Sequence, residues 1–163
     1  MKPISTKKIL LASIKAIVII VVALAIVWIW LFVRGYLSYS SYTKEHILIK
    51  SALFVGYVAD TEEKRTQGLS GKAFLPSNTS MLFKFDTPGI YGIWMKDMRF
   101  PIDIIWLDKN KKIVNLKRNV DPSTYPLVYY PPKESLYILE VRAGLIGDKD
   151  LKLGDEILFG KEE

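Results

Sequence analysis

Two acidic residues stand inside runs of apolar residues that are typical of β-strands. Asp103 lies within Ile102–Leu107 and Glu140 lies within Tyr137–Val141. Because side chains alternate between the two faces of a strand, each acid shares its face with apolar residues, and we expect both carboxyl groups to point inward. An unpaired buried charge is costly, so each carboxyl needs a cation, hydrogen bonds or a ligand.

Two cations could supply that partner. Lys96 shares its predicted strand face with Trp94, and Arg65 lies on a predicted helix. In one interpretation, a polar ligand pocket contains Arg65, Trp94, Lys96, Asp103 and Glu140. In a second, Asp103 and Glu140 are the acid and base of a glycosidase-like hydrolase. In a third, the charges are structural ion pairs that join the helix to the sheet.

A proline-rich segment, residues 121–134, supplies further candidate contacts. It contains four of the eight prolines and the three tyrosines Tyr125, Tyr129 and Tyr130. Exposed tyrosines could stack on a sugar or pack against a partner protein. Alternatively, they fix the loop to the domain, and the prolines reduce the entropy of the unfolded loop.

The residue inventory excludes several kinds of site. The chain has no cysteine and one histidine, His46. This excludes disulfides, thiol nucleophiles and zinc sites built from Cys and His. Because His46 stands at the start of the predicted domain, Ser–His–Asp catalysis is not favoured either. We therefore expect no metal site and no cofactor.

The positive charge is concentrated at the N-terminus. The chain has 23 basic and 17 acidic residues. Residues 1–43 contain five basic residues and no acidic one, so residues 44–163 carry a net charge of only +1. A nearly neutral domain gives no support to nucleic-acid binding through a basic surface, and we expect no nucleic-acid partner.

Ala16–Val33 is an 18-residue run without polar side chains. As a helix it would span roughly 27 Å, close to the hydrocarbon thickness of a bilayer. Four lysines precede it and only Arg34 follows closely, so the positive-inside rule predicts a cytoplasmic N-terminus. A cleaved signal peptide is the alternative, although its apolar region is usually shorter.

The predicted organisation therefore has four parts. Residues 1–8 form a cytoplasmic basic tail, and residues 9–33 form a single transmembrane signal-anchor helix that contacts the lipid bilayer of the cell (inner) membrane. Residues 34–45 are a tether, and residues 46–160 are an extracytoplasmic domain.

The domain sequence is rich in short strand-like runs separated by Gly, Pro and Asn. They predict a mainly β fold, a compact sandwich or small barrel with one short helix. The helix is expected after a cap at Asp60 or Thr61 and ends at Gly68. A hairpin turn is expected at residues 108–111, with Asn110 in the left-handed conformation, and Gly56 marks a candidate β-bulge.

Seven short motifs occur in order across residues 53–159. They are V-A-D-T at Val58–Thr61, R-x-x-G-L at Arg65–Leu69, M-L-F-x-F at Met81–Phe85, W-M-K at Trp94–Lys96, P-I-D-I-I-W-L-D at Pro101–Asp108, L-E-x-x-A-G at Leu139–Gly144 and G-D at Gly154–Asp155. The series resembles the bacterial and archaeal family called domain of unknown function 192. The resemblance implies a compact, jelly-roll-like β fold, often behind a signal or anchor, and no established activity.

Together these observations predict a membrane-anchored extracytoplasmic domain that binds a small ligand, an envelope polymer or a partner protein without catalysis. No complete catalytic motif is present, and the polar residues stand among strands. Two alternatives stay open at this point. One is an envelope hydrolase that uses Asp103 and Glu140, and the other is a purely structural accessory domain.

Overall fold

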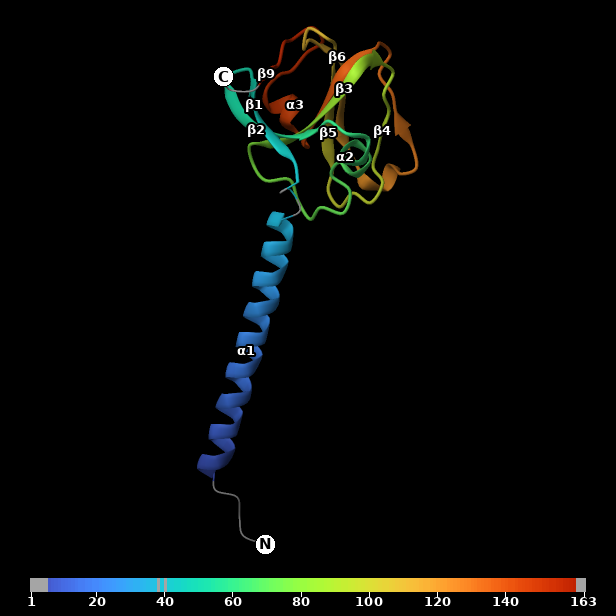
Figure 1. Cartoon of the computed structure of the whole chain (residues 1–163). Coiled ribbons are helices and arrows are strands. Elements are labelled where there is room, and N and C mark those ends of the chain that lie inside the picture. The colour runs from blue at the N-terminus through green and yellow to red at the C-terminus, as the bar shows by residue number, and fades with distance from the viewer. Residues whose placement is uncertain (1–5, 38, 40, 161–163) are drawn as a thin grey trace. The chain divides into compact units, whose positions relative to one another are not determined.

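The computed structural model describes residues 6–37, 39 and 41–160. The chain divides into two compact units, Met1–Tyr39 and Ser40–Glu163. The first unit contains helix α1 (Thr6–Leu37), shown in blue in Figure 1. Residues 1–5 of the predicted basic tail, and residues 38 and 40 of the predicted tether, lie outside the described residues.

Helix α1 carries the apolar run. Its segment Ser13–Trp30 has a mean hydropathy of 2.6 and none of it is buried. By length and composition α1 could cross a membrane, and a signal sequence near an N-terminus meets the same criterion. The structure thus confirms an apolar N-terminal helix, and its use as an anchor stays a prediction.

The second unit is mainly β, as predicted. Its large sheet has seven strands in the order β6-β5-β8-β3-β2-β1-β9, and a small sheet pairs β4 with β7. The strands are β1 (Thr43–Ile49), β2 (Ala52–Ala59), β3 (Thr79–Gly89), β4 (Ile93–Trp94), β5 (Ile102–Leu107), β6 (Ile113–Val120), β7 (Val128–Tyr129), β8 (Ser135–Arg142) and β9 (Leu158–Gly160). Short helices are α2 (Glu62–Gln67), the 3₁₀ turn η1 (Pro122–Thr124) and α3 (Leu145–Asp148).

The expectation of a barrel is wrong. The large sheet is open, with β6 at one edge and β9 at the other. A barrel would require these two edge strands to pair with each other. The expectation of one short domain helix was also incomplete, since α3 follows β8.

Local signals account for the elements that were predicted well. Thr61 caps α2 by accepting a hydrogen bond from the Lys64 amide at 3.3 Å, and Gly68 ends the helix with a φ of 44°. The 108–111 hairpin turn is present, and the Asp108 carboxylate accepts from the amides of Asn110 and Lys112 at 2.8 and 2.9 Å. The left-handed residue of the turn is Lys111, with a φ of 61°, and the expectation for Asn110 is wrong.

The connection from β2 to β3 determines where α2 and its predicted pocket residue Arg65 lie on the sheet. These two strands are parallel, whereas the hairpin pairs β1–β2 and β5–β6 are antiparallel. Parallel neighbours require a crossover connection. Here residues 60–78 make that crossover, and α2 is part of it.

The sheet is buried on both faces at its centre. One face carries a continuous apolar core to which α3 contributes Leu145 and Ile146. The other face carries Glu140 and the apolar residues that the strand register aligns with it: Met81, Phe83, Ile104, Trp106 and Ile138. We call this second face the Glu140 face.

Gly56 does not form a bulge. It pairs in regular register with Glu45 of β1 and Ser80 of β3. A Cβ atom at Gly56 would lie 2.3 Å from Cδ1 of the fully buried Ile47. The glycine is therefore explained by close packing between neighbouring strands.

Candidate functional site

Glu140 provides the buried end of the candidate site. It is 4% exposed and its strand neighbours are Met81 on β3 and Ile104 on β5. Within the described part of the chain, its Oε2 atom has no hydrogen-bond partner. Burial raises the pKa of this carboxyl to about 8. At neutral pH the group is therefore mainly protonated, and it can donate as well as accept a hydrogen bond.

A cavity of about 50 Å³ reaches Glu140. We call it the Glu140 cavity. Its walls include three of the five predicted pocket residues, which are Arg65, Trp94 and Glu140, and they also include Gly68, Leu69, Phe83, Gly92 and Ile93. The volume suits a few water molecules or one polar group of a ligand.

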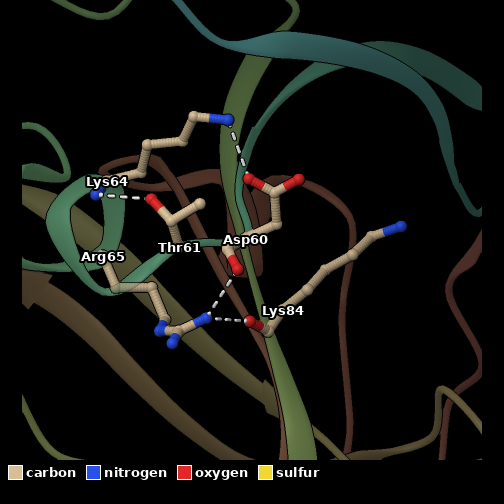
Figure 2. Close-up of polar contacts among 5 residues, drawn as sticks. All are labelled: Asp60, Thr61, Lys64, Arg65 and Lys84. Carbon is tan, nitrogen blue, oxygen red and sulfur yellow. Dashed lines mark hydrogen bonds and ion pairs between the residues drawn. The ribbon is translucent and has the colours of Figure 1, made fainter.

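Arg65 holds α2 against the sheet instead of pairing with an acid. Its Nη1 donates to the backbone carbonyls of Asp60 at 3.0 Å and Lys84 at 2.8 Å (Figure 2). Its guanidinium lies 5.1 Å from the centre of the Phe85 ring. The expectation that Arg65 pairs with Asp103 or Glu140 is not supported by these contacts.

A neighbouring contact strengthens the same junction. Lys64 on α2 donates from Nζ to the Asp60 carboxylate at 2.8 Å (Figure 2), and this hydrogen bond lowers the pKa of Asp60. On β3, Lys84 donates to both carboxylate oxygens of Glu45, at 2.7 and 2.8 Å. Lys64 and Arg65 therefore fix the wall of the Glu140 cavity that α2 provides, whereas the Lys84–Glu45 ion pair lies on the opposite face of the sheet, where Lys84 Nζ is 5.8 Å from the centre of the Phe159 ring.

A larger open groove adjoins the cavity, and we call it the α2 groove. It contains the fourth predicted residue, Lys96. Two bonds hold its sides together, from Ser70 Oγ to the Lys96 carbonyl and from the Gly71 amide to the Asp97 carbonyl, each 2.8 Å. The groove is lined by Thr61, Glu62, Glu63, Thr66, Gln67, Ser70, Gly71, Lys96, Asp97, Met98 and Arg99. Thr66, Gln67, Ser70 and Met98 also line the Glu140 cavity.

Trp94, whose ring lies near the groove residue Lys96, and Tyr125, which contacts Trp94, are exposed, and we call this pair the aromatic rim. Trp94 is 44% exposed and Tyr125 is 46% exposed. Their ring centres are 6.3 Å apart and the rings meet at 69°. The Nζ atom of Lys96 lies 5.8 Å from the centre of the Trp94 ring, which links the rim to the groove.

The three candidate tyrosines of the proline-rich loop are used differently. Tyr129 pairs with Ile93 in the small sheet and lies 5.7 Å from Nζ of Lys117, so it fixes the loop to the domain. Tyr125 and Tyr130 remain exposed. Tyr129 therefore has the docking role that was the alternative for this loop, and the stacking or partner-binding role of Tyr125 and Tyr130 stays a prediction.

Asp103 is not brought to this site. Its strand neighbour on β8 is Val141, so it projects to the face opposite Glu140. It is fully buried and accepts hydrogen bonds from the amides of Asn119 at 2.7 Å and Ile146 at 2.8 Å. These bonds join β6 and α3 to β5. A two-carboxylate hydrolase formed by Asp103 and Glu140 therefore lacks its required geometry.

Sequence reasoning missed the groove residues Thr66, Gln67, Ser70 and Met98. They are polar or flexible side chains on a crossover and a distant loop, and no periodic pattern distinguishes them.

Sequence reasoning also missed Tyr42, which was assigned to the tether. Tyr42 is buried and its hydroxyl donates to the Gly68 carbonyl at 3.3 Å, and burial together with Glu140 raises its pKa. Across the described residues, no group of three or more His, Cys, Asp or Glu could hold a metal ion.

Solved structures share this fold. A Sinorhizobium meliloti protein that carries the provisional name of a transcription regulator aligns with a TM-score of 0.68 and 23% identity, over 73% of this chain and 95% of that one. A protein of unknown function from Novosphingobium aromaticivorans aligns with a TM-score of 0.64 and 23% identity, over 72% of this chain and 84% of that one.

Two archaeal relatives are similar in sequence. A UPF0127 protein of Thermococcus sibiricus is 34% identical over 111 residues, which is 65% of this chain and 66% of the relative. A UPF0127 protein of Thermococcus kodakarensis is 32% identical over 110 residues, or 65% of each chain. The chain thus spans slightly less than two thirds of either relative. The family DUF192, "Uncharacterized ACR, COG1430", matches residues 49–159. The chain therefore belongs to the DUF192 family.

Proposed function

We propose that this domain is a non-catalytic binding module whose ligand lies in the α2 groove and extends one polar group into the Glu140 cavity. The observation that carries the proposal is the Glu140 carboxyl, which is buried and has an Oε2 atom without a partner among the described residues. Buried polar groups in folded proteins are almost always satisfied. A group left unsatisfied beside a cavity is explained when a ligand satisfies it.

The stability cost of Glu140 supports a role in binding. An unsatisfied buried polar atom costs about 1–3 kcal/mol, and Met81, Phe83 and Ile138 around it would suit an apolar side chain equally well. Arg65, which lines the cavity, fixes α2 to the backbone of β3, so the cavity is a built feature of the fold. Proteins accept such local costs at sites where function requires them.

A hydrolytic function has less support. Glycoside hydrolysis requires two carboxyl groups on either side of the scissile bond. Asp103, the predicted second carboxyl, projects from the other face of the sheet. Glu140 alone offers a neutral hydrogen-bonding group, which is suited to recognising a ligand.

Helix α1 is included in the proposal as an anchor. Its Ser13–Trp30 segment is apolar enough to span a bilayer, and the lysines that precede it favour a cytoplasmic N-terminus. The domain would then meet its ligand on the outer side of the membrane. Small molecules of the envelope and segments of its polymers are available there.

The proposal can be tested with the full chain in detergent micelles and a library of neutral polar fragments, followed by ligand-observed NMR. Thr66 is exposed and lines both the groove and the cavity, so Thr66→Trp should abolish binding of the hits. Ser51→Trp, in the exposed turn between β1 and β2, is the matched control and should bind as the wild type does.

Glu140 variants test the buried end of the site. Glu140→Gln preserves one donor and one acceptor and should retain binding, whereas Glu140→Met removes both and should abolish it. Hits that bind Glu140→Met and Thr66→Trp as tightly as the wild type would refute the proposal. Absence of any hit would refute it as well.

A further inference from the structure

Building on the proposed function, we propose that the ligand is a neutral carbohydrate, which stacks a C–H face of its ring on the aromatic rim and directs its hydroxyl groups into the α2 groove. The inference combines three properties of the site: its balance of charge, its exposed aromatic surface and its supply of small hydrogen-bonding groups.

The charges of the α2 groove favour a ligand without net charge. Three acidic residues, Glu62, Glu63 and Asp97, and two basic residues, Lys96 and Arg99, line the same groove. A strongly anionic ligand would meet the three carboxylates, and a strongly cationic ligand would meet the two cations. Like-charge contacts of this kind reduce affinity. A neutral polar molecule meets neither penalty.

The aromatic rim supplies an exposed apolar surface. Trp94 and Tyr125 are each more than two-fifths exposed, although aromatic side chains of this size are usually buried for most of their area. The rings contact each other edge to face at 69°, and Nζ of Lys96 lies 5.8 Å from the centre of the Trp94 ring, yet both residues keep large exposed areas beside these contacts. Flat apolar faces beside a polar groove suit a ligand that has one apolar and several polar sides.

The groove supplies hydrogen-bonding groups of the kind that hydroxyl groups require. Thr61, Thr66 and Ser70 bring hydroxyls and Gln67 brings an amide, all without charge. Ser70 donates to the Lys96 carbonyl and Gln67 Nε2 donates to the Ser70 carbonyl, so their oxygens remain as acceptors, and the Thr61 hydroxyl, which accepts from the Lys64 amide, keeps its donor. At the buried end, Glu140 adds a carboxyl whose Oε2 has no partner among described residues. A carbohydrate ring combines C–H faces with several hydroxyl groups, so it matches the rim, the groove and the cavity together.

The test uses the full chain, purified in an amine-oxide detergent, because a detergent with a sugar headgroup would compete for the site. The probes are glucose, galactose, mannose and N-acetylglucosamine with their β-1,4-linked disaccharides, observed by saturation-transfer NMR. Glucuronate and glucosamine serve as charged counterparts. We expect at least one neutral sugar to bind, to be excluded by Thr66→Trp, and to bind more tightly than its charged counterparts.

Variants of the rim test the stacking contact. Trp94→Ala and Tyr125→Ala should each weaken sugar binding by about tenfold, the upper range for a single aromatic contact. Trp94→Phe keeps an aromatic face and the β4 strand, so it should retain most of the affinity. Phe74→Ala removes an exposed aromatic residue that does not line the groove, and it should have no effect.

The outcomes separate the two proposals. If neutral fragments other than sugars bind in a manner sensitive to Thr66→Trp and no sugar binds, the binding module stands and the carbohydrate inference is wrong. If a sugar binds but Trp94→Ala and Tyr125→Ala bind it normally, the assignment of the rim is wrong. If no probe of either kind binds, both proposals fall.

Discussion

Asp103 and Glu140 lie on neighbouring strands and project to opposite faces of the sheet. Asp103 is paired with Val141, and Glu140 is paired with Ile104. Two backbone amides satisfy the Asp103 carboxyl, whereas one oxygen of Glu140 has no partner among the described residues. Two acids that look equivalent in the sequence therefore have different uses, one in holding the fold together and one at a candidate site.

Removing the Asp103 carboxyl should destabilise the domain. In Asp103→Ala, the amides of Asn119 and Ile146 lose their acceptor in a fully buried place, and we expect a loss of about 2–4 kcal/mol in the free energy of unfolding. Asp103→Asn keeps one acceptor oxygen and should lose less. Urea titrations measure both, with Asp148→Asn as a control whose exposed ion pair contributes under about 1 kcal/mol. Equal stability of Asp103→Ala and wild type would refute this account.

Glu140 should make stability decrease as the pH rises. Its pKa is raised from 4.5 to about 8 in the folded protein, so between these values the unfolded chain releases a proton that the folded chain retains. The contribution of Glu140 is then fully present below pH 4.5 and is lost as the pH rises through about 8. The slope for this one group approaches about 1.4 kcal/mol per pH unit. Urea titrations at pH 5, 6.5 and 8 should show the decrease in wild type and a smaller one in Glu140→Gln; parallel profiles would contradict it.

Replacing Glu140 with an apolar residue of similar length should stabilise the protein. Glu140→Met removes the unsatisfied oxygen and places a thioether beside Met81 and Ile138. At pH 8 we expect a gain of about 1–3 kcal/mol in the free energy of unfolding, measured by thermal or urea denaturation. The gain should disappear at pH 5, where the wild-type carboxyl is protonated and its contribution to stability is nearly complete. A large loss of stability at both pH values would mean that Glu140 supports the fold.

A side chain at Gly56 should destabilise the domain. A Cβ atom would lie 2.3 Å from Cδ1 of Ile47, which is fully buried and has little room to move. Gly56→Ala should therefore reduce the free energy of unfolding by about 1–3 kcal/mol. Gly147→Ala is the control, because no atom lies within 4 Å of its added Cβ and the residue is on α3. A denaturation midpoint for Gly56→Ala equal to that of the control would contradict the packing described for these strands.

The elements that depend on local signals were the ones that the sequence predicted correctly. The cap at Thr61 and the end at Gly68 define α2 without any information from distant residues. The 108–111 turn is likewise local, although its left-handed residue is Lys111, because the Asp108 carboxylate accepts from two amides of the turn and determines its shape.

The relationship between the two acids could not be predicted from alternation. Every residue of β5 is buried, so apolar residues occupy both of its faces and the pattern does not distinguish them. The face of each acid follows only from the register between β5 and β8. The open edges at β6 and β9 could not be predicted either, because the pattern of a strand does not show which strands become its neighbours.

Part of the candidate site was predicted from the sequence. Arg65, Trp94 and Glu140 share one cavity because the parallel crossover from β2 to β3 places α2 over the Glu140 face. The predicted ion pairs did not form, since backbone carbonyls occupy Arg65 and backbone amides occupy Asp103. A prediction of ion pairs from sequence assumes that charged side chains pair with one another. Here backbone carbonyl and amide groups are the partners of Arg65 and Asp103.

The pairing of β1 with β9 has a consequence for chain order. These strands are antiparallel, with His46 opposite Gly160, so the end of β9 lies beside the beginning of β1. A circularly permuted domain, in which a short linker joins these ends and the chain opens at the 108–111 turn, would keep every strand next to its present neighbours. The sheet depends on which strands are adjacent in space, and the same adjacency can be reached by more than one linear order of the polypeptide.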